Sequence, residues 1–210
     1  MLYSLKLDMK LHLAIHSAQM SSLIRDIYIK MMYAGFVRRL GVIRINIKYV
    51  YILPNDKTLF IRSEAIEKML KYRQNDSKSS EAGGILIGRI LIENGHYIID
   101  DVSEPMPTDK RSRYRFSRKP EGHQEYFNNV WERENGCCFY LGEWHTHPEY
   151  VPNPSTTDRK DWNRLIRIDF ENDDLFFVIV GIKEVKVWYG NLVTKKVIEL
   201  KRRDNVGKKQ

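Results

Sequence analysis

Hydrophobic and polar residues alternate along several short stretches of the chain, and a period of two indicates strands with one buried face. Residues 43–51 have isoleucine or tyrosine at every second position, with arginine, asparagine, lysine or valine between them. The same alternation, or a short apolar run, predicts further strands at 58–61, 83–92, 97–102, 138–144, 175–181 and 185–189. The chain is therefore expected to build a sheet from many short strands.

Apolar residues at helical spacing predict helices between these strands. Ser63 is expected to cap one helix, and Ser155 has the chemistry of an N-cap for another. A third helix is predicted over 121–135, where Trp131 is interpreted as a core residue and His123 as a surface residue. Strands mixed with helices in this way predict an α/β (α+β) domain.

The first 40 residues differ from the rest, because they carry five of the seven methionines in a loosely amphipathic pattern. We expect residues 1–40 to be a helical extension, not essential for activity, before a domain over 41–200 and a basic tail over 201–210. Histidines and serines dilute the apolar character of residues 11–24, so a signal peptide is not predicted. His12 and His16 have the spacing of metal ligands on a helix, but a surface pair is favoured.

The 210 residues suffice for one domain with a sizeable core, and 42% hydrophobic content excludes a disordered chain. No apolar run is long enough to span a bilayer, so no membrane partner is predicted. The two cysteines, Cys137 and Cys138, are adjacent and cannot cross-link distant parts of the chain. These features predict a cytoplasmic protein and give the cysteines no role.

The formal net charge is +8, and much of the excess lies in residues 110–119 and in the tail. Tyr114 and Phe116 are interleaved with the basic residues of this stretch, a mixture that can bind nucleic acid. A substrate-binding loop and a solvated insert are the alternatives. Gly83 and Gly84 indicate close approach of another backbone or of substrate, with a bulge or tight bend as the alternative.

The strongest chemical signal is a pair of histidines at the end of the predicted strand 138–144. His145 and His147 are two residues apart and should share one face, with Trp144 turned into packing. Asp158 lies three residues after Ser155, on the first turn of the next helix, where it faces back toward the strand end. Two imidazoles and one carboxylate leave the fourth position of zinc open, as in catalytic sites.

His-x-His-Pro, with seven residues between His147 and Ser155, and then Ser-x-x-Asp resembles the JAMM signature of the MPN+ (JAB) metalloprotease family. Glu81, just before a glycine-containing strand, matches the glutamate of that family, and the resemblance covers about residues 58–200. It implies a mixed, curved β-sheet flanked by helices, with one Zn²⁺ per chain at a strand end. It further implies that His145, His147 and Asp158 bind the metal, that Glu81 is the general base and that Ser155 donates a hydrogen bond to the oxyanion.

Glu143 and Trp144 before the histidines, with Glu149 after them, resemble the bacterial branch encoded beside cGAS-like nucleotidyltransferases in antiphage (CBASS) operons. That branch implies an isopeptidase that releases a nucleotidyltransferase whose C-terminal tail an E1/E2-like partner has linked to lysine. Ubiquitin-like conjugates or precursors are an alternative substrate. A silent MPN scaffold and a nucleic-acid-binding module are alternatives of another class. Glu143 is the alternative general base, because it precedes His145 by two residues.

Overall fold

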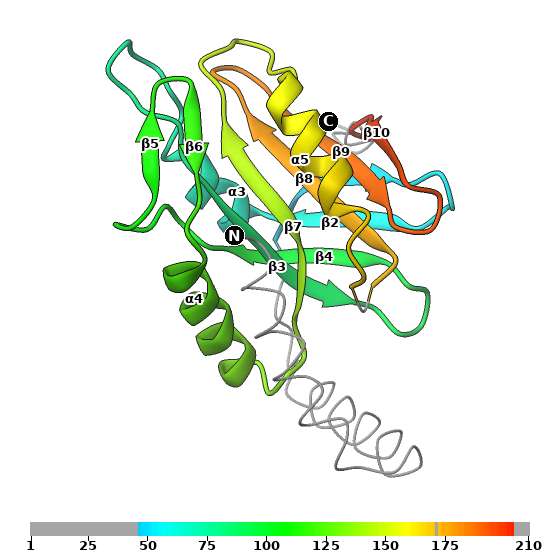
Figure 1. The fold of residues 1–210 in the computed structure, drawn as a ribbon. Helices are drawn as coiled ribbons and strands as arrows, with labels where there is room; N and C mark the ends of the chain where they lie inside the picture. Colours follow the sequence, from blue (N-terminus) through cyan, green and yellow to red (C-terminus); the bar gives the residue numbers. More distant parts are fainter. Residues whose placement is uncertain (1–45, 171, 204–210) are drawn as a thin grey trace, which may run out of the picture.

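The computed structural model describes residues 46–170 and 172–203. The predictions for residues 1–40, including His12 and His16, and for most of the basic tail lie outside the described residues. Figure 1 shows a long sheet with helices packed against it. The strands are β1 (Ile47–Ile52), β2 (Thr58–Arg62), β3 (Gly83–Ile90), β4 (Tyr97–Val102), β5 (Lys110–Ser112), β6 (Arg115–Ser117), β7 (Phe139–Thr146), β8 (Asp174–Val180), β9 (Val185–Asn191) and β10 (Lys196–Leu200), and the helices are α3 (Ser63–Leu70), α4 (Pro120–Arg133) and α5 (Thr156–Leu165).

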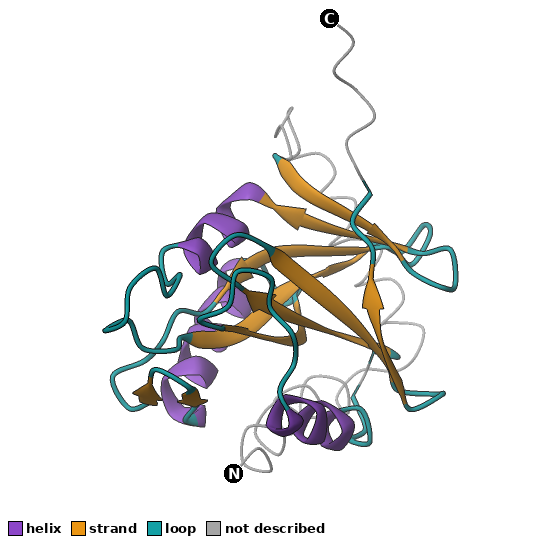
Figure 2. Cartoon of the chain, turned by 90° about the horizontal axis from the view of Figure 1, so that it is seen from above, coloured by secondary structure: helices purple, strands orange, loops and turns teal. Residues whose placement is uncertain are grey.

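The main sheet has the order β1-β2-β4-β3-β7-β8-β9-β10 and mixes parallel and antiparallel pairs. β2 pairs with β4, and β7 with β8, in parallel; the other neighbours are antiparallel. After β10 the chain returns to β1, where Arg203 N–H donates to the Val50 carbonyl at 2.9 Å. The sheet is therefore curved and nearly closed (Figure 2), which confirms the predicted α/β fold with a curved mixed sheet.

The sheet separates two hydrophobic cores, and β8 contributes to both because its side chains alternate between faces. Every residue of β8 is buried. Phe176 packs in one core with Met69 of α3. Phe177 packs in the other core, stacked on Trp162 of α5 with ring centroids 4.8 Å apart. Burial on both faces places β8 at the centre of the domain, beside β7.

Two local predictions about helices are wrong. Ser63 is not an N-cap: α3 begins at Ser63 itself, Arg62 occupies the cap position, and no side chain caps the helix. The Ser63 N–H is already paired, because it donates to the Asn46 carbonyl at 2.8 Å. His123 is not a surface residue, since it is 0% exposed. Helix α4 places it toward buried hydrogen-bond partners, which compensate for the cost of enclosing an imidazole.

Two features were not predicted as structured elements. β10 follows β9 at the sheet edge with three of its five residues exposed, so it lacks a clear apolar alternation. The basic stretch at 110–119 contains the antiparallel hairpin β5–β6, which forms a separate two-stranded sheet. None of the helices in the described ranges combines the length and apolar character that a membrane crossing requires.

Candidate metal centre

The end of β7 presents two histidines on one face, as the sequence predicts. Trp144 and Thr146 are 1% and 0% exposed and anchor the strand in the core. His145 and His147 point the other way, with their Nε2 atoms 3.1 Å apart. Alternation along a well-packed strand therefore places both imidazoles at one site.

Asp158 reaches the same site from the first turn of α5. Ser155 is the N-cap, and its hydroxyl oxygen accepts a hydrogen bond from Asp158 N–H at 3.2 Å. The Asp158 carboxylate accepts from Ser155 N–H at 2.6 Å, which completes a capping box. The carboxylate also lies 3.3 Å from Nε2 of His145 and 3.4 Å from Nε2 of His147. The helix cap thus orients the carboxylate toward the histidines.

These three side chains fit a tetrahedral zinc ion. Zinc bonds of about 2.0–2.1 Å at tetrahedral angles separate neighbouring ligand atoms by about 3.3–3.4 Å. The separations of 3.1, 3.3 and 3.4 Å among His145, His147 and Asp158 are close to that spacing. Within the described residues, this is the group of histidine and acidic side chains whose geometry suits a metal ion. Three ligands leave one coordination position for water or substrate.

The charges at the site are strongly coupled. Burial acts to raise the pKa of Asp158, but hydrogen bonds and charge from His145 and His147 hold it well below its usual value. Burial acts to lower the pKa of His147, but the hydrogen bond and charge of Asp158, with the charge of Glu81, raise it overall. Without a cation, the carboxylate therefore favours the protonated form of the His147 imidazole. A divalent cation supplies the same compensation.

Glu81 lies beside these three side chains, just before β3. Its side chain is largely buried, and Oε1 lies 4.0 Å from Nε2 of His147. Burial raises the pKa of Glu81 to about 7, against the opposing effects of the His147 charge and the Phe116 N–H. A carboxylate with a pKa near neutrality is suited to accept and return a proton.

Comparison with known proteins identifies the family. Residues 63–190 match the model for prokaryotic homologs of the JAB domain. The chain belongs to this family. Proteins named CD-NTase/cGAS isopeptidase are similar to it: one from Escherichia coli is 36% identical over 73% of this chain and 94% of its own length. Those from Vibrio cholerae and Pseudomonas aeruginosa are 37% and 38% identical, over 69% and 60% of this chain and 88% and 79% of theirs. The matches confirm the predicted JAB family and bacterial branch.

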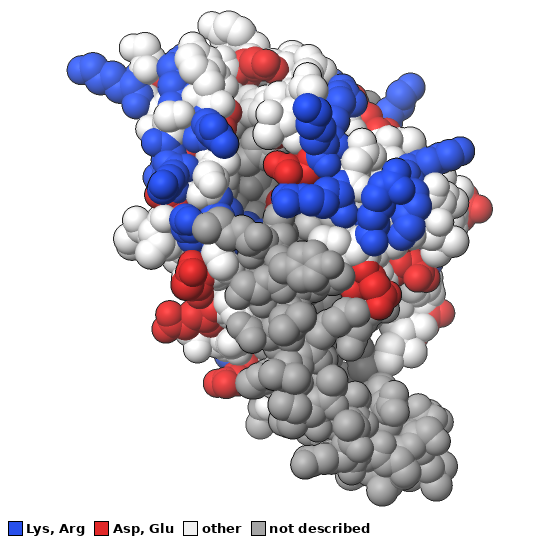
Figure 3. All heavy atoms as spheres, in the orientation of Figure 1, with Lys and Arg blue, Asp and Glu red and all other residues white. Residues whose placement is uncertain are grey.

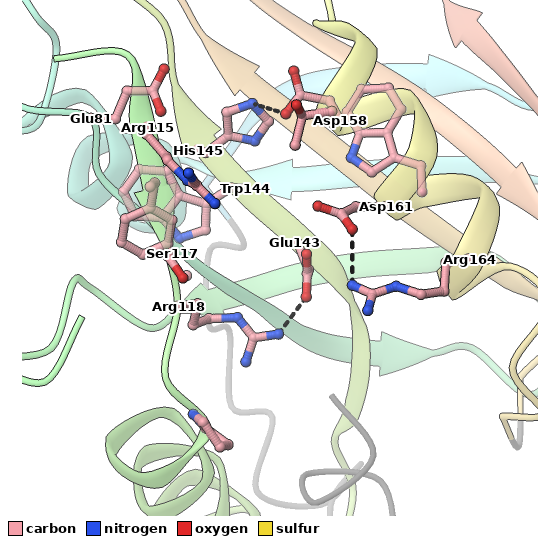
Figure 4. Close-up of a pocket in the computed structure, with 15 residues that line it drawn as sticks. Glu81, Arg115, Ser117, Arg118, Glu143, Trp144, His145, Asp158, Asp161 and Arg164 are labelled. Atoms are coloured by element: carbon pink, nitrogen blue, oxygen red, sulfur yellow. Dashed lines mark hydrogen bonds and ion pairs between the residues drawn. The ribbon is translucent and has the colours of Figure 1, made fainter. Parts of the chain in front are cut away.

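In this JAB domain Glu143 lies on the same face of β7 as His145 but is held by other partners. Its carboxylate accepts a hydrogen bond from Arg118 (Figure 4). It accepts another from the Tyr140 hydroxyl at 3.3 Å. Burial acts to lower the pKa of Arg118, but the Glu143 charge raises it overall, so the guanidinium stays protonated. Glu143 is thus ion-paired with Arg118, whereas Glu81 faces the histidines. Arg118 was not singled out by the sequence, which shows it only as one of several basic residues.

A cavity of about 250 Å³ extends from the candidate metal centre along β7. Strand β6 and helix α5 form its walls, and Glu81, Glu143 and Asp161 are among the acidic residues that line it (Figure 4). Figure 3 shows Lys and Arg side chains on two sides of this face, over the hairpin and over α5. Arg115, Arg118 and Arg164 also line the cavity. The cavity is therefore a channel of mixed charge between two basic rims.

Proposed function

We propose that this JAB-domain protein is a zinc-dependent isopeptidase that hydrolyses the bond between a protein's C-terminal tail and a lysine. We further propose that its substrate is a conjugated cGAS-like nucleotidyltransferase in antiphage defence. The names of the similar proteins support the substrate class. The observation that carries the peptidase chemistry is the triangle of ligand atoms from His145, His147 and Asp158 with Glu81 beside it.

The protein's own residues supply the proton chemistry. Bound zinc lowers the pKa of its water to about 7, so a nucleophile is available at neutral pH. Glu81 removes a proton from the attacking water and delivers it to the departing lysine amine. Ser155 uses its hydroxyl oxygen to accept from Asp158 N–H. Its hydroxyl hydrogen then donates to the oxyanion that develops on the scissile carbonyl.

The channel between β6 and α5 is the proposed path of the substrate tail. An extended tail pairs with exposed strand backbone through main-chain hydrogen bonds, and the outer strand of a small hairpin offers such an edge. The wall at β6 brings Arg115, Phe116 and Ser117 to the channel. The basic rims then face the body of the conjugate, where complementary charge increases the rate and selectivity of association.

The alternatives of another class are less well supported. A silent scaffold lacks ligands or a base, whereas all five expected side chains are present around this site. In a nucleic-acid-binding module the arginines of residues 110–119 would be available to bind phosphate groups. Arg111 and Arg113 instead donate hydrogen bonds to backbone carbonyls of the 76–81 segment, and Arg118 pairs with Glu143.

The test uses a nucleotidyltransferase conjugate whose tail is linked to lysine, with a ubiquitin-like conjugate in parallel. The full chain should bind one zinc per molecule, measured by elemental analysis, and release the nucleotidyltransferase with an intact C-terminus. His147→Ala should lose zinc and cleavage together, because two protein ligands remain. Lys183→Ala, an exposed lysine outside the ligand set, is the control. Retention of a full equivalent of zinc by His147→Ala under mild chelation would reject the ligand assignment.

A further inference from the structure

The hairpin β5–β6 lies outside the main sheet, yet its backbone reaches the proposed general base. Phe116 N–H donates to the Glu81 side chain, and Glu81 N–H donates to the Ser112 carbonyl at 2.8 Å. The Phe116 ring covers Gly83, where an added Cβ would lie 2.6 Å from a ring carbon. An isolated two-stranded hairpin is marginally stable at best. Contacts outside the hairpin must therefore hold it against Glu81.

Gln74 provides the first of these contacts from the segment after α3. It is 1% exposed and uses its whole amide group. Its Nε2 donates to the Arg113 carbonyl in the hairpin at 2.7 Å and to the Ser79 carbonyl at 3.1 Å. Its Oε1 accepts from the Thr146 hydroxyl at 3.1 Å. One buried side chain thus joins the hairpin, the segment that carries Glu81 and the strand between the two histidines.

Thr146 extends this connection to the residue after the base. Its hydroxyl oxygen accepts from Ala82 N–H at 3.0 Å, and its own N–H donates to the Ala82 carbonyl at 2.8 Å. The hydroxyl therefore donates to Gln74 and accepts from Ala82, so both its hydrogen and its oxygen have a partner. Buried polar networks whose members are all paired give one well-defined arrangement.

His123 provides a second contact at the base of the hairpin. Its Nε2 lies 3.0 Å from Asp109 and its Nδ1 lies 2.6 Å from the Ser103 hydroxyl, with the side chains of both His123 and Asp109 0% exposed. The Asp109 carboxylate also accepts from Met106 N–H and Lys119 N–H, both at 2.7 Å. Asp109 therefore closes the two ends of the segment that contains the hairpin.

The hydrogen-bond partners of His123 define its protonation. Asp109 accepts, so Nε2 carries the hydrogen, and the Ser103 hydroxyl donates to Nδ1. Burial lowers the pKa of His123, against the opposing effect of the hydrogen bond that it donates to Asp109, and the ring stays neutral. Ser103 in turn accepts from Ile85 N–H in β3 at 2.9 Å. The chain Asp109–His123–Ser103 links the base of the hairpin to the strand that follows Glu81.

We propose that Gln74 and His123 are positioning residues that hold the hairpin β5–β6 as a fixed wall and thereby orient Glu81. This inference rests on the proposed peptidase function for its kinetic consequence. Neither residue touches the reacting atoms; each acts through the hairpin backbone and Glu81. A misplacement of about 1 Å in a reacting group is enough to lower a rate by about 100-fold. The hairpin is accordingly part of the preformed site before substrate arrives.

The decisive variant is Gln74→Met, which keeps the side-chain length but removes every hydrogen bond. We expect kcat to fall by about 10-fold to 100-fold on both a conjugate and a short tail peptide. KM should change less than about threefold and zinc should stay at one per chain, because the ligands and channel remain. Gln124→Met, a glutamine on α4 outside this network, should behave as wild type. A raised KM with unchanged kcat would overturn the proposal.

His123 is tested by rescue. His123→Leu removes the link between Asp109 and Ser103 and should lower kcat, while His123→Gln offers a donor and an acceptor with similar separation and should restore most of it. His96→Gln, in the turn before β4, is the matched control. Equal activity of the Leu and Gln variants of His123 would reject a positioning role. If His123→Leu does not fold, the kcat of His123→Gln is compared with that of Gln74→Met instead. A kcat of His123→Gln no higher than that of Gln74→Met would also reject the positioning role of His123.

Hydrogen exchange separates this proposal from the proposed function. The Glu81 amide and the hairpin amides should exchange faster in Gln74→Met than in Gln124→Met, whether or not the protein cleaves a conjugate. If the wild type cleaves nothing while hydrogen exchange changes as expected, the proposed function fails, but the role of Gln74 in holding the hairpin against Glu81 is supported. If the wild type cleaves and exchange and kcat are both unchanged in Gln74→Met, the positioning proposal fails alone.

Discussion

The metal centre and the hairpin β5–β6 face the same channel but are supported in different ways. His145, His147 and Asp158 come from one strand–loop–helix unit, and the capping box at Ser155 orients the carboxylate locally. The hairpin instead depends on Gln74 and on His123, which lie on either side of it in the sequence. Loss of a metal ligand should therefore abolish the chemistry, whereas loss of a hairpin support should reduce it by degrees.

Glu81 lies where the two regions meet, so its substitution gives the largest expected effect. In Glu81→Gln the amide keeps the shape but cannot take a proton, while the three ligands are untouched. We expect kcat to fall by about 100-fold to 10,000-fold, with one zinc retained per chain, measured by steady-state kinetics and elemental analysis. Glu143→Gln should have a smaller effect because Glu143 is bound to Arg118. An active Glu81→Gln with an inactive Glu143→Gln would reverse the assignment of the base.

Ser155→Ala tests whether Ser155 both caps α5 and donates a hydrogen bond to the oxyanion. Loss of the N-cap should lower the free energy of unfolding by about 1 kcal/mol. Loss of a hydrogen bond to the oxyanion should lower kcat by about 100-fold to 1,000-fold, with zinc still bound. Thr156→Ala removes the neighbouring exposed hydroxyl, which is not the cap, and is the control. If Ser155→Ala loses stability but keeps its kcat, the residue is a cap and no more.

Acidification should lower the affinity for zinc at a pH where the hydrogen bonds that hold the hairpin are unchanged. The pKa of His147 lies above its usual value of 6.5, and zinc must displace its proton. Zinc affinity should therefore fall as the pH decreases through that raised pKa, by about tenfold per pH unit for each proton displaced. Without zinc the sign is opposite: the stability from protonated His147 is present below 6.5 and is lost as the pH rises through the folded-state pKa.

Thermal unfolding with and without zinc, at several pH values, measures how the stabilisation by zinc depends on pH. The stabilisation that zinc provides should grow between about pH 5.5 and about pH 8, because protons compete less and the apo protein loses its His147–Asp158 contribution. The hairpin contact at His123 should not follow this change, since burial keeps that imidazole neutral by lowering its pKa. Zinc stabilisation that is constant over this range would contradict the coupling between His147 and Asp158.

The separation of interacting residues along the chain explains which parts of the site the sequence alone predicted. His145, His147, Ser155 and Asp158 are close along the chain, and strand alternation and capping relate their positions by local rules. Glu81 was identified only by its match to a family. Gln74 has no sequence signal, because its partners Thr146 and Arg113 are brought to it by tertiary packing. His123 was placed on the surface for the same reason: the helical pattern does not reveal Ser103 or Asp109 as buried partners.

The basic residues of the hairpin divide into anchors and exposed charges. Arg111 donates to the Glu81 carbonyl at 2.7 Å, and Arg113 donates to the Asp76 carbonyl at 2.6 Å. In the part of the chain that the structure describes, the exposed side chains of Lys110 and Arg115 have no hydrogen bond or ion pair. Only the second pair is available to meet acidic groups on the body of a conjugate. The two pairs therefore separate support of the hairpin from recognition of the substrate.

The smallest expected effect is that of Lys110→Ser combined with Arg115→Ser. Exposed charges at an interface rim chiefly affect association, so KM for a whole conjugate should rise by a few-fold at low salt and less at moderate salt. The short tail peptide should be affected less than the conjugate, because the hairpin remains anchored and only Arg115 of the two residues lies at the channel wall. Arg111→Ser is the contrast: it removes an anchor and should lower kcat on both substrates. Steady-state kinetics of both variants on both substrates at two salt concentrations measure these effects. Equal losses of cleavage rate on peptide and conjugate in the double variant would mean that Lys110 and Arg115 also support the site.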